Sequence, residues 1–430
     1  MIPARALNRL LTVPLAAVLL AAILGFAQEQ HSASPSLLAQ TDEVLQQMSE
    51  TTGLPIRASL RKEIISRSEV QKYLTENLHA EMTPRQLHIQ EATLQAFGLV
   101  SRDFHLEKFL ITFYTEQAAG FYDPRRKTMF IADWPAPEMQ RLVLAHELTH
   151  ALQDQNFNLD KFLHAVRAND DATNARQAVA EGHATAAMMQ SIVAPAELAS
   201  LPSLEPLMAA VVHTQLKEFP AFSNAPFFFR MQALFPYIQG MGFMQRGLRI
   251  GGWDKLNSLF ADPPATTKEI FAPHFYFDRV SLPSIRLPRP TPLVSAPGVH
   301  ELTENTMGEL GCYALVGQFI SEEEGKSLGT SWLGDRYVIY EWPGTDRFSL
   351  IARTRWSSAE SALAFFRSYH TILSRKYPDL APDKRSGTDL FVGLAANGQA
   401  ILLRDGDECR WAEGIPAAQT AAVLNYLHTM

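Results

Sequence analysis

The stretch Leu144-Ala145-His146-Glu147-Leu148-Thr149-His150-Ala151-Leu152 places a His-Glu-x-x-His pattern inside an apolar helical repeat. Two histidines four residues apart leave the same face of a helix. That spacing suits two ligands of a tetrahedral zinc ion, and Glu147 can then reach a water molecule at the open position of the metal. The sequence therefore predicts a helix that carries a Zn²⁺ site.

The segment before this helix predicts a β-hairpin. Gly120-Phe121-Tyr122 and Thr128-Met129-Phe130-Ile131 have strand composition. Asp123-Pro124 lies between them and indicates a turn, because proline presets φ at the second turn position. An exposed edge of such a sheet can bind an extended peptide through its backbone. Pro135 and Pro137 come just before the helix, where proline fits a first turn.

A zinc hydrolase usually takes three protein ligands. In one arrangement a third histidine follows the second by six residues, with a glycine midway. Asn156 and Gln153 occupy those positions, so the sequence excludes this class. Another arrangement takes a glutamate from a later helix, and the alanine-rich segment 171–189 predicts such a helix with Glu181 in its middle.

His183 competes with Glu181 for the place of third ligand. The two residues lie about 200° apart around a helix, so both cannot face one metal. We favour Glu181, because Thr185 lies one turn further on and can orient its carboxylate. Gly182 weakens a helix, and a close approach to the zinc helix would explain it.

Three other residues are candidates for supporting roles. Asp154 lies one turn after His150, where it either accepts a hydrogen bond from the second ring nitrogen of His150 or is a solvated residue near the helix end. Tyr237 and His213 are alternatives for stabilising the oxyanion that forms when water attacks a carbonyl. The sequence leaves open which of the two has this role, or whether both are structural.

Together these residues resemble the exported bacterial zinc metallopeptidases of gluzincin type. The resemblance covers about residues 60–290 and rests on the segments 116–124, 146–155, 179–185, 235–240, 251–253 and 263–270. It implies that His146, His150 and Glu181 bind zinc and that Glu147 is the general base. The chain departs from the pattern at Ala272, where such sequences often carry a histidine before a proline.

The whole chain has an ordinary globular composition. It has 430 residues, which predicts two or three domains, and 47% of them are hydrophobic. A net charge of −7 argues against a general nucleic-acid binder. The partner implied by the resemblance is a polypeptide substrate, and the sequence specifies no oligomeric state.

The amino terminus has the layout of a secretory signal peptide. Arg5 and Arg9 precede an apolar run over 10–26, and small residues lead up to a cleavage position after Ala27. The alternative is an uncleaved membrane anchor, but the run is short for a span. No other segment could cross a membrane. We therefore expect a periplasmic or secreted protein.

These signals predict an α+β fold. It comprises a mainly helical zinc-metallopeptidase domain, with a small β-hairpin or sheet before the active-site helix, and a small C-terminal α+β domain. The expected order is a signal peptide (1–27), an N-terminal helical region (28–115), the metallopeptidase core (116–282), a proline-rich linker (283–300) and the C-terminal domain (301–430). Within the N-terminal region the helical pattern runs from Leu37 to about Phe97.

The C-terminal domain contains no recognisable catalytic cluster, so a structural or substrate-recruiting role is expected. Strands are predicted at 337–340, 348–352, 390–394 and 400–403, and helices at 307–320, 359–377 and 417–428. Asn397-Gly398 is a strong hairpin turn. Cys312 and Cys409 form either one disulfide or two separate buried thiols.

The leading hypothesis from the sequence is a zinc-dependent peptidase. An alternative is a non-catalytic, zinc-stabilised protein for binding or assembly in the cell envelope. The intact Glu147 argues against that alternative, because a purely structural zinc site does not use a general base. Hydrolysis of a non-peptide amide is a third hypothesis, since the pocket rather than the ligands decides the substrate.

Overall fold

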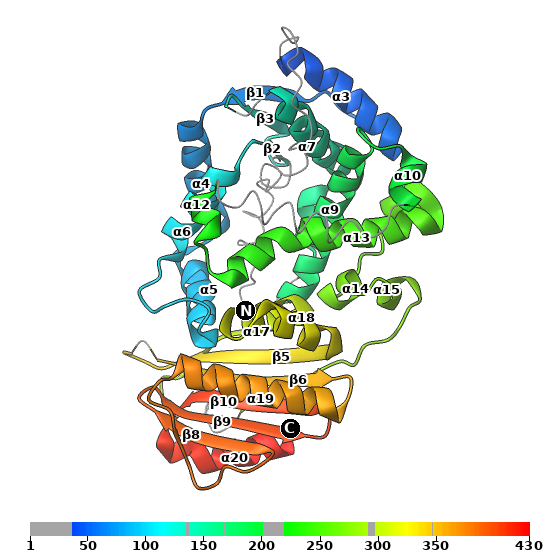
Figure 1. The fold of residues 1–430 in the computed structure, drawn as a ribbon. Helices are drawn as coiled ribbons and strands as arrows, with labels where there is room; N and C mark the ends of the chain where they lie inside the picture. The colour runs from blue at the N-terminus through cyan, green and yellow to red at the C-terminus, as the bar shows by residue number, and fades with distance from the viewer. Residues whose placement is uncertain (1–36, 135–136, 167–168, 201–218, 291–296, 346) are drawn as a thin grey trace.

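The computed structural model describes residues 37–134, 137–166, 169–200, 219–290, 297–345 and 347–430. Helices form most of the first two thirds of the chain, and a large sheet with flanking helices forms the last third (Figure 1). The predicted α+β class is therefore confirmed. The predicted signal peptide, 1–27, lies outside the described residues. Among the described helices, none is long and apolar enough to cross a membrane.

The predicted hairpin is confirmed, and it belongs to a three-stranded sheet of order β1-β3-β2. Strands β2 (Gly120–Asp123) and β3 (Thr128–Ala132) are antiparallel, and β1 (Arg61–Ile65) pairs with β3 in parallel. The prediction of helix throughout 37–97 is thus wrong at β1, because a partner far away in the sequence imposes this strand. Strands β2 and β3 are buried along their whole length, so the exposed edge of the sheet is β1.

The helices of the first part surround this small sheet. Their bounds are α3 (Leu37–Thr52), α4 (Arg67–Glu81), α5 (Pro84–Phe97), α6 (Leu106–Gln117), α7 (Pro137–Phe157), α8 (Leu159–Leu163), α9 (Asp170–Met189), α10 (Pro195–Ser200), α12 (Pro220–Ser223), α13 (Phe227–Ser258), α14 (Thr267–Phe271) and α15 (His274–Phe277). Helix α13 is broken at Gly251 and Gly252, where Gly252 has φ +59°. Glycine suits that conformation because it has no Cβ.

The C-terminal part is a seven-stranded antiparallel sheet of order β4-β5-β6-β10-β9-β8-β7. Its elements are β4 (His300–Asn305), α17 (Gly308–Phe319), α18 (Glu322–Ser331), β5 (Trp332–Glu341), β6 (Phe348–Trp356), α19 (Ala359–Lys376), β7 (Ala381–Pro382), β8 (Leu390–Ala395), β9 (Gly398–Asp405), β10 (Glu408–Ile415), η2 (Ala417–Gln419) and α20 (Thr420–Thr429). Helix α19 packs on one face, in a core with Trp356, Phe365 and Trp411, and α20 packs on the other. The predicted strands and helices of this part are confirmed, whereas β4, β7, β10 and α18 are additional.

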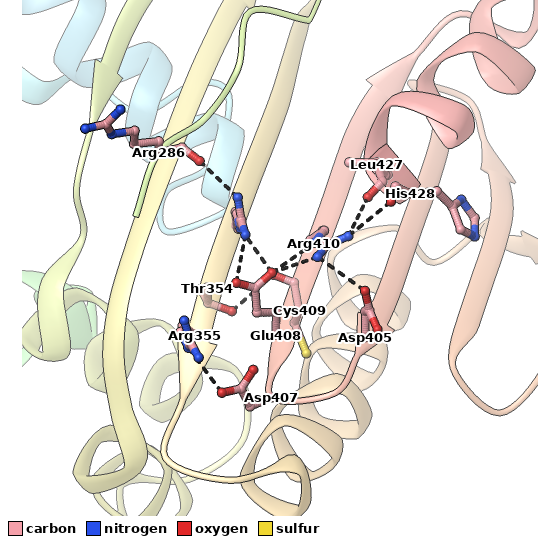
Figure 2. Close-up of polar contacts among 11 residues, drawn as sticks. Arg286, Thr354, Arg355, Asp405, Asp407, Glu408, Cys409, Arg410, Leu427 and His428 are labelled. Carbon is pink, nitrogen blue, oxygen red and sulfur yellow. Dashed lines mark hydrogen bonds and ion pairs between the residues drawn. The ribbon is translucent and has the colours of Figure 1, made fainter. Parts of the chain in front are cut away.

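Strand β10 carries an ionic cluster of largely buried charged side chains (Figure 2). The Glu408 carboxylate accepts hydrogen bonds from Arg353 at 2.8 and 3.1 Å and from Arg410 at 2.8 and 3.2 Å. Arg353 also donates to the Arg286 carbonyl at 3.3 Å, and Arg410 donates to the Leu427 carbonyl at 3.1 Å. The cluster therefore fixes both the proline-rich segment and the end of α20 to the sheet.

The two parts of the chain share one hydrophobic core. The rings of Phe97 in α5 and Tyr337 in β5 meet edge to face at 5.0 Å, and Gln318 in α17 donates to the Leu99 carbonyl at 2.7 Å. Cys312 and Cys409 are both buried and free, so the structure has two separate thiols rather than a disulfide. The C-terminal part is thus packed against the helical part as one body.

A buried polar junction ties the start of α9 to the C-terminal part. Asp171 accepts a hydrogen bond from the Thr267 N–H at 2.8 Å. Asp335 in β5 accepts from the N–H groups of Met307 and Gly308 at 2.8 and 2.9 Å. Gly308 has φ +76°, and a Cβ there would lie 2.0 Å from an oxygen of Asp171. Only glycine fits between these two carboxyl groups.

The Asp335 carboxyl should make stability depend on pH. Burial raises its pKa to about 7, although the two backbone hydrogen bonds act in the opposite direction. Its unfolded pKa is about 3.9, so the folded state holds a proton that the unfolded state releases between these values. Stability from this group is therefore lost as pH rises through that window, by up to about 1.4 kcal/mol per pH unit.

Asp335→Asn removes this titration. Urea unfolding at pH 5 and pH 8 should show that wild type loses more free energy of unfolding between the two values than the variant does. An equal loss in both proteins would contradict the assignment.

Candidate metal centre

Two helices bring three ligand atoms together. Helix α7 places His146 and His150 on one face, with their Nε2 atoms 3.1 Å apart. Helix α9 contributes Glu181, whose Oε2 lies 3.1 Å from the Nε2 of His146 and 3.3 Å from that of His150. All three side chains are buried, with at most 5% of each residue exposed. The three atoms form a nearly equilateral triangle.

The size of this triangle fits a metal ion. Nitrogen and oxygen ligands lie about 2.0–2.1 Å from zinc, and at a tetrahedral centre such ligands are about 3.3–3.4 Å from one another. The observed separations of 3.1–3.3 Å are close to that value. Two imidazoles and a carboxylate are also a donor set that zinc accepts. The cluster could therefore hold a metal ion.

Glu147 lies beside the cluster, and only one of its two carboxylate oxygens is hydrogen-bonded to the described residues. One of its carboxylate oxygens lies within 4.8 Å of a ring nitrogen of His146 and of a ring nitrogen of His150. Its Oε2 accepts the backbone N–H of Tyr122 at 3.0 Å. Its Oε1 is buried and has no hydrogen-bond partner among the described residues. Burial raises the pKa of Glu147 to about 8, against the opposing effects of His150 and of the Tyr122 N–H. One carboxylate oxygen is thus held while the other is free.

The electrostatics of the cluster favour an ion pair between an ionised Glu181 and a protonated His150. Burial alone would raise the pKa of Glu181, but the charge of His150 and hydrogen bonds from both histidines lower it to about 2. Burial likewise opposes the charged form of His150, yet Glu181 raises its pKa to about 9. A buried carboxylate needs such a partner, because an unpaired buried charge is costly.

The structure does not bring His183 to the cluster. Its Nδ1 lies 3.1 Å from Nε2 of Gln153, and its Nε2 lies 3.0 Å from Oδ1 of Asn257. Its ring packs edge to face against Trp253 and Phe260 at 5.0 and 5.3 Å. Burial lowers the pKa of His183 to about 4. The 200° separation on α9 thus turns Glu181 toward α7 and His183 toward α13.

Two supporting roles expected from the sequence are wrong. The hydroxyl of Thr185 donates to the backbone carbonyl of Glu181 at 2.7 Å rather than to its carboxylate. Asp154 does not contact His150, because its carboxylate is taken by the Tyr122 hydroxyl at 2.8 Å and by the Lys127 ammonium at 2.5 Å. Asp154 therefore fixes the hairpin to α7.

Gln153 is the residue that sequence reasoning missed. Its Oε1 lies 2.9 Å from Nδ1 of His150, in the place expected for Asp154. From the sequence, position 153 only excludes one class of zinc peptidase. The signal that could have found it is a long polar side chain three residues after a ligand, where it can fold back onto the ring.

Gly182 allows a close approach of helices, as predicted, but its partner is α13 rather than the zinc helix. A Cβ on Gly182 would lie 2.6 Å from the carbonyl carbon of Gly240, and a Cβ on Gly240 would lie 2.6 Å from the Ala178 carbonyl oxygen. The prediction was wrong about the partner because α13 follows α9 at a distance in the sequence. This glycine contact sets the depth at which α9 presents Glu181.

Of the two candidates for oxyanion stabilisation, the structure places Tyr237 at the cluster. Its ring lies in α13 beside that of His146, with centroids 5.8 Å apart and planes 29° apart. Tyr237 is buried. His213 lies outside the described residues.

Comparison with known proteins agrees with the geometry of the cluster. Residues 106–204 match the IrrE N-terminal-like domain of peptidase family M78. The matched segment spans the hairpin, α7 and α9, so the part of the chain with the cluster is similar to a zinc metallopeptidase-like family. Residues 295–424 match a domain of unknown function, DUF8575. No curated protein and no solved structure matches the chain.

The glycine contact predicts a sharp difference between two substitutions in α13. Gly240→Ala should lower the free energy of unfolding by about 1–3 kcal/mol, because the new methyl group meets the backbone of α9. It should also weaken metal binding, because α9 carries Glu181. Gly242→Ala is the matched control: its Cβ would meet nothing within 4 Å, and alanine favours a helix. Urea unfolding measures the stability of the two variants, and metal titration measures their affinity. Equal effects of the two substitutions would contradict the role of the glycine contact.

Proposed function

We propose that this protein is a zinc-dependent peptidase in which His146, His150 and Glu181 bind Zn²⁺ and Glu147 is the general base. The observation that carries the proposal is the triangle of ligand atoms beside a buried carboxylate with one free oxygen. The match of 106–204 to a peptidase family supports a hydrolase that acts on polypeptides. The gluzincin assignment rests on the glutamate in α9 as third ligand.

The roles of the residues follow from their contacts. Bound zinc supplies a water of lowered pKa and polarises the scissile carbonyl. The positive charge of the metal would favour the ionised form of Glu147, which would then accept the water proton at Oε1 and deliver it to the leaving amine. The Tyr122 N–H holds the other oxygen, so the carboxylate keeps its orientation during proton transfer. Asp154 fixes the hairpin to α7 and so helps to keep the Tyr122 N–H at Glu147.

We also propose that the protein acts outside the cytoplasm, in the periplasm or after secretion. The support is the layout of residues 1–27, with Arg5 and Arg9 before an apolar run and a cleavage position after Ala27. The amino-terminal sequence of the mature protein tests this. A start at Gln28 is expected, and an intact, membrane-bound amino terminus would indicate the anchored alternative.

Substitutions at the two glutamates separate the chemistry from metal binding. Glu147→Gln should abolish hydrolysis of an unfolded polypeptide while zinc stays bound, because the amide cannot accept the proton. Glu181→Ala should lose the metal itself. Zinc content by elemental analysis and cleavage of unfolded casein measure both effects.

The possible outcomes of this experiment discriminate between the hypotheses. Retained hydrolysis in Glu147→Gln would contradict the general base. Loss of zinc in a His183 variant but not in Glu181→Ala would contradict the ligand assignment. A zinc-loaded wild type that cleaves no polypeptide would favour the non-catalytic envelope protein.

Tyr237 is proposed to stabilise the oxyanion, because its ring lies beside that of His146. Tyr237→Phe should lower kcat by about 10²–10³-fold with little change in KM, since the hydroxyl acts on charge that develops in the transition state. His213→Gln serves as the comparison. If His213→Gln causes the loss of kcat and Tyr237→Phe does not, the assignment moves to His213.

A further inference from the structure

A line of hydrogen-bonded side chains runs from the cluster to the end of α3. Nδ1 of His150 lies 2.9 Å from Oε1 of Gln153, and Nε2 of Gln153 lies 3.1 Å from Nδ1 of His183. Nε2 of His183 lies 3.0 Å from Oδ1 of Asn257, and Nδ2 of Asn257 donates to the Thr52 carbonyl at 2.9 Å. The line links four helices, α7, α9, α13 and α3.

Backbone carbonyls fix the direction of every bond in this line. The Ala180 carbonyl can only accept, so the Gln153 atom 2.9 Å from it is the amide nitrogen. The Gln153 oxygen therefore faces His150, and Nδ1 of His150 must carry the hydrogen. At the other end the Thr52 carbonyl fixes the Asn257 amide in the same way.

The ring between the two amides has one tautomer that satisfies both. The Asn257 oxygen faces Nε2 of His183, which must carry its hydrogen, and the Gln153 N–H faces Nδ1, which must be bare. Each group thus donates to the next in one direction, away from the cluster. Hydrogen bonds aligned in this way polarise one another.

We propose that Gln153, His183 and Asn257 form a positioning relay that holds His150 in the Nδ1–H tautomer. With Nδ1 engaged in this way, Nε2 of His150, which faces Glu181 and His146, is the ring nitrogen that would bind the metal. A histidine that donates its second N–H binds metal better, because its ring is oriented and its basicity is raised. This inference rests on the proposed function only in taking the cluster to be a metal site.

The fold places the relay residues with little freedom. Asn257 lies in the last turns of α13, after the break at Gly251 and Gly252, and contacts His183 of α9. Gln153 and His183 are fully buried, and the His183 ring is held between Trp253 and Phe260. A buried polar network of this kind is costly unless every member is paired. The distances show that each side chain of the relay is hydrogen-bonded to the next group in the line.

Metal affinity of the whole protein, measured for Zn²⁺ and Co²⁺ by competition with a chelator, tests the relay. Gln153→Met keeps the length of the side chain but removes its hydrogen bonds, and it should weaken affinity by about 10–100-fold. His183→Phe keeps an aromatic ring against Trp253 and should weaken affinity by a smaller factor. The double variant should bind as Gln153→Met does, because His183 acts only through Gln153.

Asp154→Asn is the matched control. It alters the next residue of α7 and weakens the contacts to Tyr122 and Lys127, but it touches no member of the relay. It should lower stability while metal affinity stays within twofold. If Gln153 had only a structural role, Gln153→Met and Asp154→Asn would behave alike: in both, metal affinity would fall in proportion to the loss of stability.

Nitrogen-15 NMR of histidine-labelled protein gives a readout that is independent of activity. His183 should show a protonated Nε2 and a bare Nδ1, with or without metal. A protonated Nδ1 on His183, unchanged affinity in Gln153→Met, or additive losses in the double variant would each overturn the relay.

The outcome also separates this inference from the proposed function. Hydrolysis that depends on Glu147, together with unchanged metal affinity in Gln153→Met, contradicts the relay alone. A wild type that binds no Zn²⁺ contradicts the proposed function, while the tautomer of His183 still tests the relay.

Discussion

The buried carboxylate of Glu181 between two imidazoles is the interaction on which the rest of this structure depends. A lone carboxylate in the protein interior is strongly unfavourable, so its neighbours must supply compensating charge and hydrogen bonds. His146 and His150 do so from one face of α7, at 3.1 and 3.3 Å. The glycine contact between α9 and α13 sets the depth of α9, and Gln153 holds the ring of His150. Each feature around the cluster keeps three atoms within a triangle that fits a metal ion.

The C-terminal part contributes to this arrangement because it contacts the start of α9. Asp171 lies at the first turn of the helix that carries Glu181, and it packs against Gly308 and bonds to Thr267. One continuous core joins the helical part to the inner face of the large sheet. The part of the chain that matches a domain of unknown function therefore packs against the start of the helix that carries Glu181.

Much of the fold could be predicted where the signal is local. The histidine spacing, the hairpin and the Asn397-Gly398 turn are read from a few neighbouring residues, and the structure has them. Strand β1 could not be predicted, because its pairing with β3 outweighs a weak local pattern. Strand β10 was not predicted either. Glu408-Cys409-Arg410-Trp411 alternates polar and apolar residues, but Glu408 and Arg410 are buried in an ionic cluster instead of facing water (Figure 2).

The sequence by itself determined which chemical groups are available and which of them share a helix face. His146, Glu147 and His150 are related by helical geometry alone, and so is the divergence of Glu181 from His183. Only the tertiary structure decided what meets these faces: Glu181 opposite the histidines, Gly240 against Gly182, and the hairpin groups of Tyr122 and Lys127 on Asp154. The reason is physical. Helical periodicity fixes directions within one element, whereas contacts between elements depend on how whole helices pack and on which donor claims each buried oxygen.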